Sequence, residues 1–145
     1  MPVTVKPVTL WRKEIENKPG TLAATLEPLA MAGADLQVIM GYRFPGKPDA
    51  AAVELFPVKG KKVIAAAQAA GLEISTIPTL LVEGDNKPGL GYAVATSLAG
   101  AGINISFLIA QVVGRKYSAV IGFDTADDAK MAAALVKKAT AGKKK

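Results

Sequence analysis

The chain has 145 residues, half of them hydrophobic, and contains neither cysteine nor histidine. These absences exclude disulfides, thiol nucleophiles and thiolate metal sites, and they remove the commonest general base and transition-metal ligand. The net charge is +6, but five lysines lie in the last nine positions, and without them 13 basic residues face 12 acidic ones. We therefore expect a nearly neutral globular body with a solvated basic tail over residues 140–145, and no nucleic-acid-binding arm.

The chain shows no sign of a membrane or secretory segment. No apolar run approaches the roughly 18 residues of a membrane span. The N-terminus lacks the charged-then-apolar layout of a secretion signal. We expect a cytoplasmic protein with no membrane partner, built as one domain or two small ones.

The first half of the chain predicts the order β-α-β-β-α-β. Leu22, Leu26 and Leu29 recur at helical spacing after a loop, with Thr21 as the expected cap. Pro28 predicts a kink and not an end, because the apolar period continues past it. This order is that of the ferredoxin-like fold, with four antiparallel strands and both helices on one face. Strands are expected over residues 8–15, 35–41, 51–58 and 72–77, and helices over residues 21–32 and 61–70.

The same pattern then repeats. The sequence Asn-Lys-Pro-Gly at residues 17–20 recurs at residues 86–89, and nine of 20 positions are identical between residues 17–36 and residues 86–105. Self-similarity at a fixed offset indicates that each copy is one structural unit. In the second copy strands are expected over residues 79–83, 104–113 and 117–123, and helices over residues 90–101 and 127–139, the last with Thr125 or Asp127 as its cap.

The second copy lacks a fourth strand, because nothing after residue 138 resembles one. Residues 2–6 are rich in β-branched side chains, and Pro7 separates them from the next strand. Either this segment fills the vacant edge of the second sheet, or it is a disordered leader and the strand is absent. We predict one domain over residues 8–78 and a second over residues 79–139.

The repeated loop has the features of a binding site for an anionic group. In each copy it follows a strand and precedes a helix, whose unpaired amides and positive dipole end favour a carboxylate or phosphate. Asn17 and Asn86 add amide groups, and Asp35 and Asn104, at the start of the second strands, are expected close to the loop as acceptors for an ammonium group. Pro-Gly before a helix is, however, also what any strand-to-helix turn needs.

These features resemble ACT domains in tandem. The resemblance depends on the loops over residues 16–20 and 85–89, and on Gly-Ile-Asn-Ile at residues 102–105. Residues 33–36 of the first copy are a looser version of that last segment, and the missing fourth strand departs from the pattern. The resemblance covers nearly the whole chain.

The resemblance implies a regulatory role. ACT domains usually bind amino acids at the interface between paired domains and report occupancy to an attached enzyme or repressor. No such domain is present in this sequence, so the resemblance implies an ACT-only sensor of a free amino acid, with no cofactor, acting on an unidentified protein or as a homo-oligomer. Its two sheets are expected to sit edge to edge. The implied ligand-binding residues are Asn17, Pro19, Gly20, Asp35 and Leu36 in the first copy, and Asn86, Pro88, Gly89, Leu90, Asn104 and Ile105 in the second.

Three alternatives differ from this interpretation. The carboxylates are scattered without the spacing of an acid–base pair, so we expect no enzyme. The aromatic residues do not cluster as in an RNA-binding sheet, although Tyr42, Arg43 and Phe44 come nearest. A purely structural or oligomerising module stays open, since exposed antiparallel edges favour pairing with another copy, and we expect a homodimer. Leu90, Ile105 and nearby apolar residues hint at an apolar side chain on the ligand.

Overall fold

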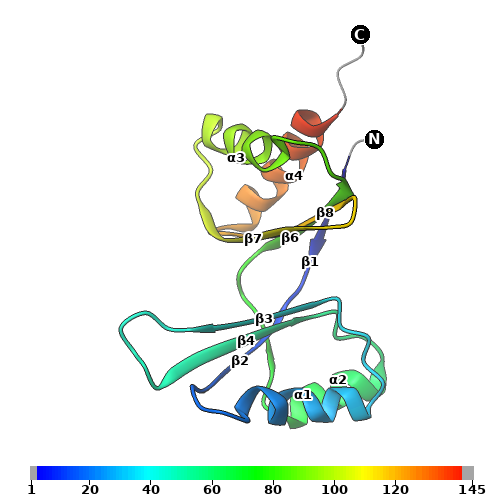
Figure 1. Ribbon diagram of the computed structural model, residues 1–145, viewed down its shortest axis with the longest axis vertical. Coiled ribbons are helices and arrows are strands. Elements are labelled where there is room, and N and C mark those ends of the chain that lie inside the picture. The colour runs from blue at the N-terminus through cyan, green and yellow to red at the C-terminus, as the bar shows by residue number, and fades with distance from the viewer. Residues whose placement is uncertain (1–2, 142–145) are drawn as a thin grey trace. The chain divides into compact units, whose positions relative to one another are not determined.

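The computed structural model describes residues 3–141, whose contacts divide the chain into two compact units. The first unit comprises residues 9–76, and the second unit comprises residues 77–141 together with the N-terminal segment 3–8. Each unit is a four-stranded antiparallel sheet with two helices on one face (Figure 1). The predicted α+β class with two ferredoxin-like units is confirmed.

In the first unit, the order of strands across the sheet is β3-β4-β2-β5. Trp11, Val53 and Leu55 face the helices and pack with Leu29 and Ala67, because alternate strand residues point to one side. The first helix continues through Pro28. The bounds are β2 Trp11–Glu16, α1 Thr21–Met31, β3 Val38–Arg43, β4 Ala50–Phe56, α2 Lys61–Ala69 and β5 Glu73–Ile74.

In the second unit, the order across the sheet is β1-β6-β8-β7. Leu80, Val82 and Ile121 face the helices, where they pack with Leu98 and Val136. The bounds are β1 Thr4–Val8, β6 Thr79–Asp85, α3 Leu90–Gly100, β7 Ile105–Val113, β8 Lys116–Phe123 and α4 Ala126–Thr140.

The N-terminal strand β1 takes the position in the second sheet that β5 takes in the first. It pairs antiparallel with β6 from Thr4 opposite Glu83 to Val8 opposite Thr79. Val3 and Val5 are each 7% exposed and belong to the core of the second unit. The strand continues through Pro7, which we expected to interrupt it, and an edge strand tolerates proline because one side of its backbone needs no partner.

The fourth strand of the first unit is shorter than predicted. Only Glu73 and Ile74 form β5, and they pair with Arg12 and Trp11 alone. On this side, the rest of β2 from Lys13 onward has no strand beside it within the described part of the chain.

Both ends of the last helix, α4, carry side chains that stabilise them. The side chain of Thr125, one of the two predicted caps, accepts from the backbone N–H of Asp128 at 3.0 Å. Acidic residues occupy the first turn of α4 and lysines the last, as the helix dipole favours. The helix ends at buried Thr140, and residues 142–145 of the predicted tail lie outside the described residues. No helix in residues 3–141 is both long and apolar enough to cross a membrane.

Replacing Gly84 with alanine should destabilise the second unit by about 1–3 kcal/mol, the usual cost of overpacking. A Cβ at Gly84 would lie 2.9 Å from the Cα of Val3, so β1 would have to move away from β6. Urea unfolding measures the effect. Gly91→Ala is the matched control, since a Cβ there meets nothing within 4 Å. Equal stability of the two variants would contradict the docking of Val3 against β6.

Candidate functional site

The two repeated loops share one backbone geometry. Gly20 and Gly89 are the N-cap residues of α1 and α3, with φ of 91° and 84° respectively. This left-handed conformation favours glycine, since a Cβ would be strained there. Within the described residues no side chain caps either helix, and neither first turn holds an acid. The first amide of each helix donates to a loop carbonyl, Thr21 to Lys18 at 3.4 Å and Leu90 to Lys87 at 3.2 Å. The next two amides of each helix have no hydrogen-bond partner among the described residues, and the positive dipole end is not neutralised.

We predicted Thr21 as the cap of α1, but Gly20 occupies the cap position. The Thr21 hydroxyl instead lies within hydrogen-bond distance of two carbonyl oxygens, those of Glu16 at 2.7 Å and Lys18 at 2.9 Å. Thr21 therefore ties the start of the helix to the strand that precedes the loop.

Asn17 holds the loop against the hairpin between β3 and β4. Its backbone N–H donates to the carbonyl of Asp49 at 2.9 Å, and its side-chain amide donates to the carbonyl of Pro48 at 2.7 Å. The backbone N–H of Asn86 donates in the same way to the carbonyl of Arg115 at 2.7 Å. The amide nitrogen of Asn17 thus has a structural role, and the side-chain oxygen is the atom that a ligand would contact.

Asp35 and Leu36 lie at the opposite end of the sheet from the loop, so the expected proximity is wrong. β3 begins at Val38 and reaches the level of the loop only at its last residue, Arg43. Five strand residues span roughly 17 Å. The reason is topological: helix α1 returns the chain across the sheet, so the next strand starts at the far end. Leu36 packs against the core of the first unit.

Asn104 and Ile105 are separated from the Asn86 loop in the same way. Ile105 packs against the core beside Phe123 at one end of the sheet, whereas Asp85, which precedes the loop, pairs with Lys116 at the other. Asn104 and Ile105 therefore cannot contact the same small molecule as the loop of their own unit.

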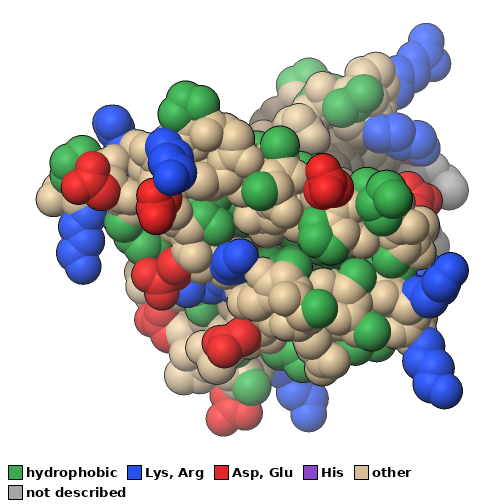
Figure 2. All heavy atoms as spheres, turned by 90° about the horizontal axis from the view of Figure 1, so that it is seen from below, with side chains coloured by type: hydrophobic (Ala, Val, Ile, Leu, Met, Phe, Trp, Pro, Cys, Tyr) green, Lys and Arg blue, Asp and Glu red, His purple; other side chains and the backbone are tan. Residues whose placement is uncertain are grey.

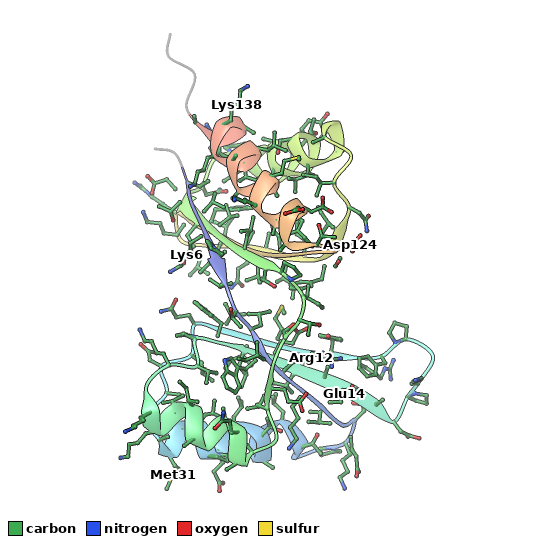
Figure 3. All side chains as sticks on the ribbon, turned by 180° about the vertical axis from the view of Figure 1, so that it is seen from behind. Lys6, Arg12, Glu14, Met31, Asp124 and Lys138 are labelled. Carbon is green, nitrogen blue, oxygen red and sulfur yellow. The ribbon has the colours of Figure 1, made fainter. Side chains whose placement is uncertain are left out.

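Asn104 instead belongs to a small polar cluster around Asp124. The Ser106 hydroxyl donates to Asp124 at 2.7 Å and the Asn104 side-chain amide donates at 3.3 Å. These bonds favour the ionised carboxylate and hold the pKa of Asp124 below its usual range. Asp124 is exposed on the surface just after β8 (Figure 3).

A cavity of about 270 Å³ opens beside the first loop, between the start of α1 and the ends of β2, β3 and β4. Lys18 forms an ion pair with Glu16, with 3.1 Å between Nζ and Oε2. Arg43 is exposed, and in residues 3–141 it forms no ion pair. The lining is Ile15, Glu16, Asn17, Lys18, Thr21, Leu22, Gly41, Tyr42, Arg43, Ala51, Ala52 and Val53.

Of the predicted ligand-binding residues, only Asn17 lines this cavity. Pro19 and Gly20 form the turn behind it, and Leu90 of the second copy is buried in the core. Arg43 and Ala51 were missed as site residues, because the pairing of β2, β3 and β4 brings them beside the loop from distant positions in the sequence. Thr21, which follows the loop directly, was expected only as a helix cap.

A second cavity, of about 410 Å³, lies on the other side of the same loop. It follows the edge of β2 that β5 leaves unpaired, from Lys13 to Glu16, and is closed by Ala24 and Thr25 of α1. The Asn17–Gly20 loop is therefore accessible from both sides.

Glu54 is an unexpected buried acid on the sheet face away from the helices of the first unit. It is 1% exposed, and its Oε2 accepts from the Tyr42 hydroxyl at 2.8 Å. Burial, then the bond to Glu54, raises the pKa of Tyr42. Oε1 of Glu54 has no hydrogen-bond partner among the described residues. Arg12 lies opposite Glu54 on the neighbouring strand, but its ion pair is with Glu14, at 3.4 Å. Arg12 and Glu14 are labelled in Figure 3.

The first unit has the order βαββαβ and the second the order βαββα, completed by β1, so the chain has the predicted architecture of two ACT-like, ferredoxin-like units in tandem. No family model and no curated protein matches the chain. Solved structures do match, and at the identities found they show the fold alone.

Three of these structures cover nearly the whole chain. Protein BT0572 from Bacteroides thetaiotaomicron has a TM-score of 0.72 at 17% identity, over 88% of this chain and 87% of that one. The regulatory subunit of aspartate kinase from Thermus thermophilus has a TM-score of 0.64 at 19% identity, over 96% and 97%. That from Thermus flavus has a TM-score of 0.59 at 18% identity, over 96% and 97%.

Replacing Gly20 with alanine should lower the free energy of unfolding by about 1–2 kcal/mol, because alanine is strained at positive φ. A Cβ there meets nothing within 4 Å, so strain and not a clash is the cause. Gly41→Ala is the control, since it is equally open and lacks a positive φ. Chemical denaturation compares the two variants. A Gly20→Ala protein as stable as wild type would contradict the left-handed geometry.

Replacing Ser106 with alanine should raise the pKa of Asp124 toward its ordinary value, because the shorter of its two hydrogen bonds is lost. An NMR titration of the carboxyl carbon measures this. The folded-state pKa is lowered, so the stabilisation is present above the unfolded-state pKa and is lost as pH falls through the folded-state pKa. Ser118→Ala should leave the titration unchanged. An unchanged Asp124 pKa in the Ser106 variant would disprove the assignment.

Proposed function

We propose that the chain is a regulatory module that binds a free amino acid beside the Asn17–Gly20 loop and has no catalytic activity of its own. This proposal rests on the cavity of about 270 Å³. The cavity is lined by the uncapped start of α1, by the unpaired Arg43 and by apolar side chains. Few groups could act in acid–base catalysis there, and residues 3–141 hold no cluster of three potential metal-ligating residues.

The cavity offers complementary groups for each part of an amino acid. The carboxylate would meet the Arg43 guanidinium and the unpaired amides that follow Thr21 in the first turn of α1. The ammonium group would meet the side-chain oxygen of Asn17 and the carboxylate of Glu16. An apolar side chain would pack against Ile15 and Val53. Two of the similar structures are described as regulatory subunits of aspartate kinase, which supports a sensing role.

We further propose that the protein acts as a homodimer. Within the first unit, the predicted ligand-binding residues Asp35 and Leu36 lie roughly 17 Å from the Asn17–Gly20 loop. They could therefore contact a ligand at such a loop only from another ACT unit. A second chain would supply it. Asn104 and Ile105 of a second chain would likewise approach the ligand at the Asn17–Gly20 loop, which keeps the predicted location of ligands at interfaces between ACT units.

The regulated partner is proposed to be another cytoplasmic protein. We expect no nucleic-acid or membrane partner. On the face of the first unit that carries α1 and α2, acidic, basic and hydrophobic side chains are interspersed, without a broad basic patch (Figure 2). Nucleic-acid binding would require such a patch.

An oligomerisation module is the second candidate, because β7 is an unprotected edge strand. Its nine residues, Ile105–Val113, include no charge and no proline. Leu108 and Val112 on one face, and Ile109 and Val113 on the other, are between 43% and 67% exposed. Uncharged edges of this kind pair readily with a second copy. This function would need no ligand.

Thermal unfolding in the presence of each of the twenty L-amino acids at millimolar concentration tests the proposed function. Binding at about 100 times the dissociation constant adds roughly 2.7 kcal/mol, a visible rise in melting temperature. We expect one amino acid or a small related group to respond, and Arg43→Ala to remove the response with the fold intact.

Arg115→Ala is the matched control, since Arg115 lies exposed in the corresponding hairpin of the second unit. Its response should equal that of wild type. No response of the wild-type protein to any amino acid would reject the sensor and leave the oligomerisation module.

A further inference from the structure

The two units place different residues around the same loop. The strand residue before each loop pairs with Ala50 in the first unit and with Lys116 in the second. One step further along, Ala51 lies opposite Ile15, and Tyr117 lies opposite Gly84. This register makes Tyr117 the counterpart of Ala51.

Large side chains fill the second unit where the first unit has its cavity. Tyr117 is 5% exposed and Leu90 is 3% exposed, and both pack in the core of the second unit. Their counterparts, Ala51 and Thr21, line the open cavity of the first unit. Burial also raises the pKa of the Tyr117 hydroxyl, as expected for a phenol that has lost much of its water.

The charge that would hold a carboxylate is also missing from the second unit. Arg43 lies opposite Ala51 at the edge of the first sheet, whereas Val112 lies opposite Tyr117 at the edge of the second. Lys116, the nearby cation, is engaged by Asp85 at 2.5 Å, and this ion pair holds the pKa of Asp85 below its usual range.

The other side of the second loop is closed by β1. In the first unit, the free edge of β2 leaves the cavity of about 410 Å³. In the second unit, β1 covers the same edge of β6, and Val3 packs directly on Gly84. Residues 86–89 are themselves exposed, but the spaces on both sides of the second loop are filled, whereas those beside the first loop are open.

We infer that this chain binds one ligand, in the first unit alone, and that the Asn86–Gly89 loop is a structural turn. The inference rests on the proposed function, to which it adds the number of ligands per chain and the residues that decide which unit binds. Ala51 and Thr21 keep the first cavity open, Arg43 selects a ligand with a carboxylate, and Tyr117 and Leu90 fill the second position.

Isothermal titration calorimetry with the amino acid that gives the largest melting shift in the panel tests the inference. The expected stoichiometry is one per chain. Ala51→Tyr, which gives the first unit the filling side chain of the second, should weaken binding at least tenfold. Lys87→Ala, on the second loop, should leave affinity and stoichiometry unchanged. Circular dichroism verifies the fold of each variant.

If Ala51→Tyr fails to fold, Arg43→Val is the alternative variant. It gives the exposed edge strand β3 the residue type that β7 has at the corresponding position, Val112, and should also weaken binding at least tenfold. Two ligands per chain would overturn the inference while the amino-acid sensor stands. Full affinity in both first-unit variants would overturn the inference and the proposed location of the site, and leave only the binding of an amino acid. A wild-type protein that binds none of the twenty amino acids would overturn both.

Discussion

The pairing of β1 with β6 is the constraint on which the second unit, and the order of the two units along the chain, depend. It completes the second sheet with a strand from the other end of the sequence, so β6 becomes an interior strand and Val3 and Val5 enter the core. Burying a valine fully stabilises by about 1.5–3 kcal/mol. The same pairing makes the first unit an insertion between β1 and β6. It also closes one side of the second loop, whereas β5, with two residues, leaves the equivalent side of the first loop open.

Conserved local geometry and divergent surroundings explain how one repeat can have two roles. The four loop residues recur, and both glycines adopt the same left-handed conformation before an uncapped helix. That geometry alone produces a turn and a partial positive charge, in either unit. Whether a ligand can reach it depends on strand residues far away in sequence, above all on alanine at position 51 and tyrosine at position 117. Those positions lie outside the stretch in which the repeat is strongest.

Most of the fold could be predicted from the sequence, because local periodicity indicates each helix and strand and the repeat indicates that the same unit occurs twice. The pairing of β1 with β6 was one of two alternatives, because it joins segments far apart in the sequence. The site could be predicted only in part. Asn17 was found because it belongs to the loop itself. Asp35 and Asn104 were placed beside the loops, but a helix that crosses back over the sheet puts the following strand's start at the far end. Arg43 and Ala51 come to the loop through the register of β2, β3 and β4, which depends on the turn geometry of the β3–β4 hairpin, and the Gly- and Pro-rich hairpin sequence did not reveal that geometry. Glu54 alternates with the core residues Val53 and Leu55 along β4, which is typical of an exposed position, and yet it is buried.

The insertion of the first unit has a consequence for how the chain is made. Thr4 and its partner Glu83 are 79 residues apart in sequence, so β1 leaves the ribosome long before β6 exists. At roughly 5–20 residues per second, the delay lasts several seconds. During it the first unit, which draws no strand from outside residues 9–76, has all it needs to fold. The nascent N-terminus meanwhile carries an unpaired, valine-rich strand. Synthesis thus sets an order of assembly in which the first unit, the proposed ligand-binding half, is finished first.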